Sequence, residues 1–187
     1  MSIHADHPFL PPEGERDPLR RLRGRLPAAV SVWTTAAGGR RAGWTLSSFL
    51  LADGDPAELL GLLDEESDLA DLLADSGTVA VSLLRWEHRF LADAFAGVAP
   101  APGGPFRLGT WTDTPWGPVL DDAVGWVGAR LRAPLGEHAG WGLLVRAEVE
   151  QVELADAGSA LLTSVRGRYR GAEPDGPAAG PASTLRP

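Results

Sequence analysis

The 187-residue sequence contains no cysteine and no lysine, and these absences exclude several classes of chemistry. Without cysteine the chain has no disulfide framework, no thiolate metal ligand and no thiol nucleophile. Without lysine it has no side chain that forms a Schiff base with a carbonyl substrate. All 17 basic residues are arginines. Arginine suits bidentate contacts with phosphate, but genome composition is the simpler explanation of the bias.

Positive charge and long apolar runs are also scarce. The formal net charge of −8 argues against general nucleic-acid binding, which depends on basic residues that neutralise phosphates. No apolar run approaches the roughly 18 residues needed to cross a membrane. The start of the chain lacks the charged-then-apolar order of a secretion signal. We therefore expect a cytoplasmic protein without nucleic-acid or membrane partners.

The chain has enough apolar residues for one core, since 44% of its residues are hydrophobic and its length corresponds to about one domain. Residues 1–15 hold three prolines and are expected to form a flexible arm, in which His4 and His7 are solvated rather than metal ligands. Residues 16–170 are expected to form the domain. Residues 171–187, dominated by Gly, Pro and Ala, are expected to be a disordered tail.

Short strands between turn residues dominate the pattern of the domain. Strands are predicted over 29–35, 43–48, 57–63 (where a helix is the alternative), 78–84, 123–131, 141–154 and 160–165. Helices are predicted over 17–26, 67–76 and 87–95, the second capped by Ser67 and Gly77. Residues 106–118 give no clear element. Many short strands with few short helices indicate a mainly β barrel rather than a layered parallel sheet.

The segment Gly43–Ser48 is the first candidate site. It forms the far arm of a hairpin that turns through residues 37–40, where Gly38 and Gly39 favour a tight turn. Gly43 lets another molecule approach the backbone. The hydroxyls of the segment belong to Thr45, Ser47 and Ser48. These features suit an anion site, and the alternative is a half-exposed strand whose hydroxyls face water.

Further motifs follow Gly43-Trp44-Thr45-Leu46-Ser47-Ser48 in a recognisable order. They are Ser67 at the start of an acidic helix, Phe95-Ala96-Gly97, Glu137-His138 and Arg166-Gly167-Arg168-Tyr169, with Val30–Thr35 preceding them all. In this order the motifs resemble those of the flavin reductase-like family, whose members use an FMN-binding split β-barrel and usually work as homodimers. The first motif is similar to the family's Gly-Met-Thr-x-Ser-Ser, with Trp44 at the methionine position. The resemblance extends from Leu19 to Arg170.

The resemblance implies that FMN or FAD lies against the hairpin and its partner subunit. Backbone groups of residues 45–48 would bond the polar edge of the flavin, and the N-terminus of the helix at Ser67 would favour its phosphate. His138 would lie on the nicotinamide side near Arg168 and Tyr169, the alternative being an ordinary surface histidine. The flavin-binding residues implied are Gly43, Trp44, Thr45, Leu46, Ser47, Ser48, Ser67, Phe95, Ala96, Gly97, Arg168 and Tyr169.

The activity implied by the resemblance is that of an NAD(P)H-dependent flavin reductase. Hydride would pass from C4 of NADH or NADPH to N5 of the flavin, and the reduced flavin would serve a partner monooxygenase. One alternative is a flavin-binding carrier or sensor without turnover. Another is a barrel of the same fold that has lost flavin or holds deazaflavin or haem.

An acidic segment sets this chain apart from the pattern of the family. Residues 53–75 contain nine acidic residues and no basic one, so a phosphate near Ser67 would face like charges. The counter-charge would have to come from elsewhere in the chain. The arginines considered for it are Arg40, Arg41, Arg85 and Arg89.

Overall fold

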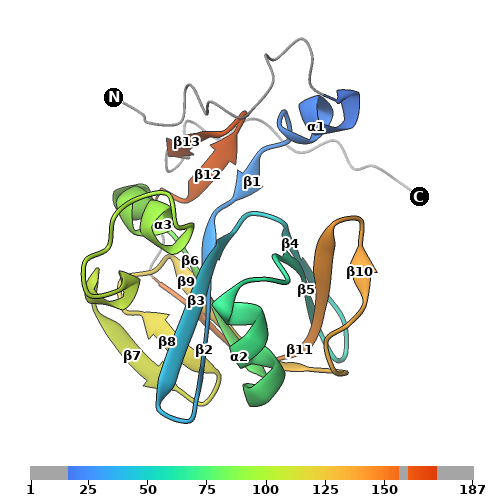
Figure 1. Cartoon of the computed structure of the whole chain (residues 1–187), viewed down its shortest axis with the longest axis vertical. Coiled ribbons are helices and arrows are strands. Elements are labelled where there is room, and N and C mark those ends of the chain that lie inside the picture. Colours follow the sequence, from blue (N-terminus) through green and yellow to red (C-terminus); the bar gives the residue numbers. More distant parts are fainter. Residues whose placement is uncertain (1–16, 156–159, 172–187) are drawn as a thin grey trace, which may run out of the picture.

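Antiparallel strands are the main regular structure of the protein (Figure 1). The computed structural model describes residues 17–155 and 160–171. The strands of its largest sheet are β2 (Ser31–Ala37), β3 (Arg40–Leu46), β4 (Phe49–Ala52), β5 (Glu58–Leu63), β6 (Thr78–Leu83), β9 (Gly125–Leu131), β10 (His138–Ala139) and β11 (Gly142–Leu154). Their order is β3-β2-β6-β9-β11-β5-β4, with β10 paired to β11. The sheet curls into a half barrel, which confirms the predicted split-barrel class.

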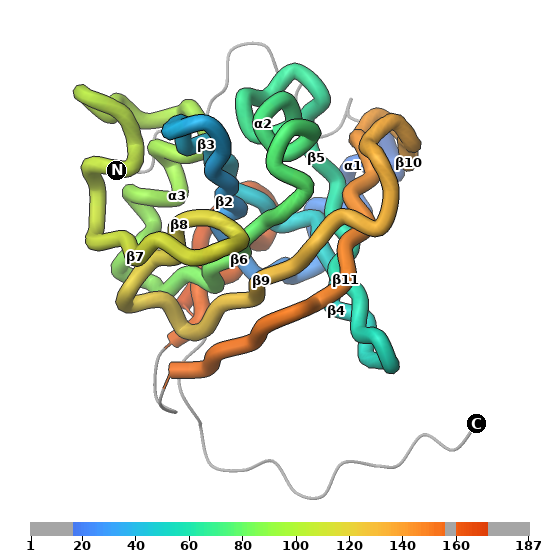
Figure 2. Tube along the Cα trace, turned by 90° about the horizontal axis from the view of Figure 1, so that it is seen from below, coloured from blue at the N-terminus to red at the C-terminus, as the bar shows by residue number. Residues whose placement is uncertain are grey.

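Two smaller sheets and three helices complete the fold. The smaller sheets comprise β1 (Ala28–Ala29) with β12 (Leu162–Val165) and β13 (Arg168–Gly171), and β7 (Trp111–Thr114) with β8 (Gly117–Leu120). The helices are α1 (Pro18–Arg23), α2 (Asp68–Ser76) and α3 (Arg89–Phe95), with single turns η3 (Trp86–His88) and η4 (Pro105–Arg107). Figure 1 shows α1 and the β1–β12–β13 sheet above the barrel, and Figure 2 shows α3 and the β7–β8 hairpin on the side opposite β10.

Local sequence signals account for the elements that we predicted. The β2–β3 hairpin turns at Gly38 and Gly39, whose φ angles of 57° and 77° favour glycine. Helix α2 begins after Ser67, whose hydroxyl accepts a hydrogen bond from the Ala70 N–H at 3.2 Å. It ends at Gly77 in the left-handed conformation. The strand predicted over 57–63 is β5, so the helical alternative is excluded.

Other elements were missed by sequence reasoning. Strand β4 has no apolar–polar alternation, and β7 and the start of β8 lie in the stretch 106–118 that prolines interrupt. Proline is tolerated there because the two strands form a separate hairpin rather than the middle of a sheet. Strand β13 ends at Gly171, one residue past the expected end of the domain. The expected arm and the rest of the expected tail lie outside the described residues.

Strand β2 separates two hydrophobic clusters. Val32 and Trp33 are consecutive and both fully buried, so their side chains enter opposite sides of the strand. Trp33 belongs to the cluster inside the half barrel, which also contains residues of α2, β5, β6, β9 and β11. Val32 belongs to the cluster under α3, together with Leu91 and Phe95. The two clusters therefore meet at one strand, and β3 lies beside it at the edge of the sheet.

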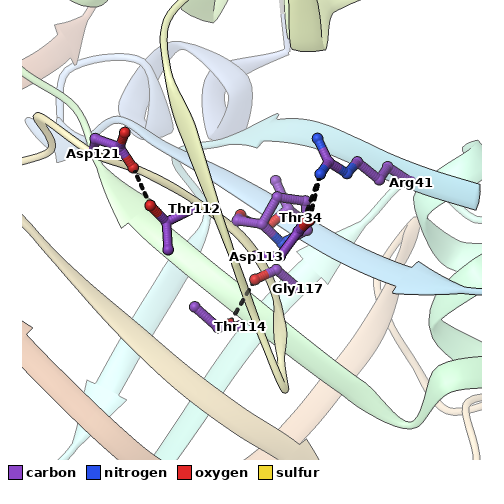
Figure 3. Close-up of polar contacts among 8 residues, drawn as sticks. Thr34, Arg41, Thr112, Asp113, Thr114, Gly117 and Asp121 are labelled. Carbon is purple, nitrogen blue, oxygen red and sulfur yellow. Dashed lines mark hydrogen bonds and ion pairs between the residues drawn. The ribbon is translucent and has the colours of Figure 1, made fainter.

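The β7–β8 hairpin is attached to β2 and β3 by polar contacts (Figure 3). The buried Thr34 hydroxyl donates to the Pro118 carbonyl oxygen at 2.5 Å. Arg41 donates to both carboxylate oxygens of Asp113 at 2.7 and 2.6 Å. Charge-assisted bidentate pairs of this kind fix orientation as well as distance. The hairpin is thus held against the tip of the β2–β3 hairpin.

Gly61→Ala is expected to destabilise the fold by about 1–3 kcal/mol, the usual cost of overpacking a core. A Cβ at Gly61 would lie 2.4 Å from Cη2 of the buried Trp33. Urea denaturation measures the change. Gly24→Ala is the control, since its Cβ would have 3.4 Å of space and its φ of −64° suits alanine. Equal effects of the two substitutions would show that the contact with Trp33 does not limit this position.

Candidate functional site

The predicted segment runs off the end of β3. Gly43–Leu46 are the last residues of the strand, whereas Ser47 and Ser48 belong to neither β3 nor β4. Alternation places Gly43 and Thr45 on the side of α3, and Trp44 and Leu46 against the cluster inside the half barrel. Trp44 and Leu46 therefore anchor the segment to the core inside the half barrel. Ser47 and Ser48 are the residues of the segment that lie outside the strands.

Helix α3 occupies the open face at Gly43. A Cβ at Gly43 would lie 2.7 Å from Cε1 of Phe95 and 3.1 Å from the Trp33 carbonyl oxygen. The Thr45 hydroxyl donates to the Ala92 carbonyl oxygen at 2.7 Å. On this face of β3, the space left by the missing Cβ of Gly43 is therefore filled by the Phe95 side chain and not by a ligand.

Phe95, the first residue of the Phe95-Ala96-Gly97 motif, lies beside Gly43. Phe95 is buried and makes edge-on contacts with Phe106 and Trp111, with ring centroids 5.0 and 5.4 Å apart. Ala96 ends α3, and Gly97 follows with a φ of 70°. Phe95 thus acts as a core residue that holds α3 against β3.

Most hydroxyls of the predicted site are already engaged within the chain. Ser48 donates to the Leu62 carbonyl oxygen at 3.3 Å, and the buried Ser67 donates to the Asp64 carbonyl oxygen at 2.6 Å. Ser47 is exposed, and its hydroxyl forms no hydrogen bond within residues 17–155 and 160–171. A ligand at the end of β3 would therefore meet the hydroxyl of Ser47 and backbone that is not part of a strand.

Tyr169 lies next to α3, and Arg168 is exposed beside it on β13. The Tyr169 hydroxyl is 2.9 Å from Oδ1 of Asp93, to which it donates. Burial and this hydrogen bond raise the pKa of Tyr169 above its ordinary value of 10.0. Tyr169 therefore belongs to the group of predicted residues around α3, together with Gly43 and Thr45.

His138 belongs to a second group, near the start of α2. Its Nε2 lies 3.0 Å from Oε2 of Glu65, two residues before Ser67. Strand β10, which carries His138, lies at the right of Figure 1, and β13 lies at its upper left. A single chain thus does not bring His138 to Arg168 and Tyr169. Ser48 connects the segment to the second group through β5, because its carbonyl oxygen accepts the Leu62 N–H at 3.0 Å.

The four arginines considered for a phosphate lie at two ends of the sheet. Arg40 and Arg41 begin β3, about 20 Å from its end at Leu46, and Arg41 is paired with Asp113. Arg40 and Arg41 are therefore too far away to neutralise a phosphate bound near Ser47. Arg85 follows β6 at the other end, because Ser31 pairs with both Leu46 and Leu83.

Arg85 has donor capacity that the fold does not use. Its buried Nε has no hydrogen-bond partner within the described ranges, although its Nη2 donates to the Ala123 carbonyl oxygen at 3.3 Å. A buried donor without a partner is uncommon and marks a place where a ligand gains a hydrogen bond. Neighbouring Arg89 lies over the Trp86 ring at 4.9 Å. The sequence alone did not show which arginine lies near Ser47. The strand register shows that Arg85 lies at that end of the sheet and that Arg40 and Arg41 lie at the other.

No group of three or more His, Asp or Glu side chains in the described ranges is arranged to hold a metal ion. Within the same ranges, no helix is both long enough and apolar enough to cross a membrane.

Comparison with known proteins identifies the family of this fold. The family model described as a flavin reductase like domain matches residues 23–173. FMN reductase (NADH) RutF of Methylorubrum extorquens strain DM4 is 35% identical over 153 residues, which cover 81% of this chain and 72% of that protein. The counterpart from Serratia proteamaculans is 31% identical over 125 residues, 66% of this chain and 71% of that protein.

Solved structures share the fold. The NADH:FAD oxidoreductase SgcE6 of Streptomyces globisporus C-1027 superimposes with a TM-score of 0.73 at 25% identity, covering 86% of this chain and 98% of that one. Flavin reductase PheA2 gives a TM-score of 0.73 at 22% identity, covering 83% and 98%. The protein is a split-barrel protein with the fold of the flavin reductases. It belongs to the flavin reductase like domain family.

The chain contains a single tyrosine, so phenolate absorbance reports on Tyr169 alone. We expect its titration to begin well above pH 10 in the folded protein and near pH 10 in urea. The raised pKa stabilises the fold below pH 10, and this contribution is lost as the pH rises towards the folded-state pKa. Tyr169→Phe removes the signal and serves as the blank. Ionisation of the folded protein near pH 10 would contradict the buried hydrogen bond to Asp93.

Proposed function

We propose that the protein is an NAD(P)H:flavin oxidoreductase. The observation that carries the proposal is the 35% identity to an FMN reductase (NADH) over most of both chains, in a protein of the same family. The local geometry is compatible, since the exposed Ser47 and backbone outside the strands lie between α3 and β5.

FMN or FAD is the proposed cofactor, and NADH or NADPH the proposed co-substrate. The relatives named above are an FMN reductase and an NADH:FAD oxidoreductase, and the latter was solved with NAD and FAD fragments. Another protein of this fold, the flavin reductase HpaC, was solved with NADP+. When bound, the two cofactors supply the hydride donor at nicotinamide C4 and the acceptor at flavin N5.

The chain itself would position the reactants. Ser47 and the backbone of residues 47–48 would bond the polar edge of the flavin. The hydroxyl of Thr45 holds α3 and so fixes the segment, while Trp44 and Leu46 anchor it to the core. Orientation of this kind accounts for much of the catalysis of bimolecular reactions, and hydride transfer requires no protein acid or base.

The other predicted residues take supporting positions in this proposal. Ser67 would act through the N-terminus of α2 rather than through its engaged hydroxyl. Arg85 would provide the positive charge for the phosphate. His138 would lie on the nicotinamide side, with Arg168 and Tyr169 contributed from the other group. Because one chain separates these groups, the proposal requires a homodimer in which two subunits complete each site.

The proposed role is to supply reduced flavin to a partner monooxygenase in the cytoplasm. Proteins of the same fold include BorF, the flavin reductase component of a two-component tryptophan halogenase, and a homologue of nitrilotriacetate monooxygenase component B from Mycobacterium thermoresistibile. Their pairing with an oxygen-using component supports the same arrangement here.

A flavin-binding carrier or sensor without turnover is the second candidate. The observation that favours it is the exposed acidic surface next to Ser67, formed by Asp64, Glu65, Glu66 and Asp68. These carboxylates would oppose a flavin phosphate and an anionic dinucleotide alike.

Purified protein with added FMN is expected to oxidise NADH or NADPH in air faster than an FMN-only blank. The absorption spectrum recorded before and after nicotinamide addition shows whether flavin is bound and reduced. A flavin spectrum without nicotinamide oxidation would establish the carrier alternative and contradict the reductase.

Ser47→Ala is expected to weaken FMN binding about three- to tenfold, the effect of losing one hydrogen bond. Quenching of flavin fluorescence measures the affinity. Ser48→Ala is the matched control, since its hydroxyl already donates to Leu62, and its loss is expected to change stability more than affinity. Unchanged binding in Ser47→Ala would remove this hydroxyl from the site.

A further inference from the structure

Within residues 17–155 and 160–171, the apolar face of α1 is not covered by any other element. Leu19, Leu22 and Leu26 are 73%, 58% and 61% exposed, and no residue of the helix is buried. Their spacing places them on one side of the helix and its extension. Leucines on a folded, capped helix favour burial, because removing apolar surface from water is favourable.

The remaining surface of this segment is basic. Its four arginines are Arg20, Arg21, Arg23 and Arg25. None of them forms an ion pair with a residue in 17–155 or 160–171. Asp17 caps the helix by accepting the Leu19 N–H at 2.6 Å and is the only acidic residue of the segment. The unpartnered helix is therefore apolar on one side and positive around it.

A second uncovered surface lies at the opposite edge of the large sheet from β3. Strand β4 is the edge strand, and Leu50 and Leu51 are 61% and 45% exposed. Beside them is an apolar depression of about 280 Å³, lined by residues of β4, β5 and β11, among them Leu60 and Leu144, and by Ser48, which precedes β4. An open apolar edge strand invites pairing or aggregation, and stable proteins cover it.

Acidic residues lie beyond both ends of β5, and Arg146, opposite Leu60 on β11, is neutralised by its ion pair with Glu58. Asp53 and Asp55 lie in the turn between β4 and β5, and Asp64, Glu65 and Glu66 follow β5 directly. All five are exposed, and residues 53–75 contain no basic side chain. The β4–β5 surface is thus apolar with an acidic rim, the complement of α1.

Within one chain, α1 does not lie on the β4–β5 surface. The Arg166 N–H donates to the Gly24 carbonyl oxygen at 2.6 Å, which holds the end of α1 beside the β1–β12–β13 sheet. Figure 1 shows α1 at the top of the molecule and β4 separated from it, in the body of the barrel. A second copy offers both complements at once, since a two-fold dimer uses each surface twice.

We propose that in the homodimer α1 of each subunit lies on the β4–β5 surface of the other. This inference rests on the homodimer of the proposed function and specifies its interface. The three leucines of α1 cover Leu50, Leu51 and the depression, and the arginines face the acidic rim. Because Ser48 lines the depression, each α1 also closes one side of the other subunit's candidate flavin site.

Cysteine cross-linking tests the contact in a chain that has no native cysteine. Leu22→Cys and Leu50→Cys proteins, mixed and oxidised, are expected to give disulfide-linked dimers that neither protein gives alone. Trp141→Cys replaces Leu50→Cys in the control, because Trp141 is fully exposed on the turn between β10 and β11. Cross-linking of Leu50→Cys alone would overturn the proposal in favour of β4 pairing with β4.

Charge reversal provides a second test with a built-in rescue. Arg20→Glu/Arg23→Glu and Asp53→Arg/Asp55→Arg are each expected to raise the dimer dissociation constant about tenfold or more, since several ion pairs reverse at once. The four substitutions combined are expected to restore it. Asp121→Arg, remote on the β8–β9 turn, is the control for a charge reversal outside the proposed interface. Failure of the combined variant to recover would overturn the assigned pairing.

Sedimentation of the unmodified protein separates this inference from the function on which it rests. A monomer at assay concentration contradicts both the proposed homodimer and its interface. A dimer without the Leu22–Leu50 cross-link contradicts the interface alone. Flavin reduction is measured independently of either outcome.

Discussion

The contact between Trp33 and Gly61 is the constraint on which the half barrel depends. Strands β2 and β5 are not neighbours in the sheet, so the indole spans the interior to reach the β5 backbone. The indole N–H donates to the Ser31 hydroxyl at 3.1 Å, and that hydroxyl donates to the Leu46 carbonyl oxygen at 3.0 Å. One side chain therefore fixes the distance across the barrel and the end of β3 together. Two residues further on, Ser48 is bonded to Leu62 of β5.

The candidate site is built from groups that serve the fold and groups that remain free. Gly43 accommodates Phe95, and the hydroxyls of Thr45 and Ser67 satisfy carbonyl oxygens of the chain. These contacts make the segment rigid, and rigid elements position ligands better than mobile loops. Ser47 and the donor group of Arg85 remain for a ligand. Some residues of the site thus stabilise the fold and others are available to a ligand, and the sequence alone does not show which are which.

Sequence reasoning succeeded where the signal was local and failed where it depended on distant partners. Gly38 and Gly39 define a turn, and Ser67 and Gly77 define the ends of α2, within a few residues of each element. The engagement of Thr45 by Ala92 involves residues 47 positions apart, which periodicity does not register. The position of Arg41 relative to Ser47 likewise depended on the strand register. The fold class was therefore predictable, whereas the free and engaged donors of the site were not.

The acidic segment and the basic helix have one physical explanation when they are taken together. Exposed carboxylates beside Ser67 repel an anionic flavin, and no basic residue of segment 53–75 offsets them. In the proposed dimer the four α1 arginines of the second copy lie along that rim and reduce its negative potential. Flavin binding would then depend on assembly as well as on the end of β3, because an isolated subunit retains the repulsion. The acidic surface that opposes flavin binding in an isolated subunit would thus be the surface that binds α1 of the second subunit.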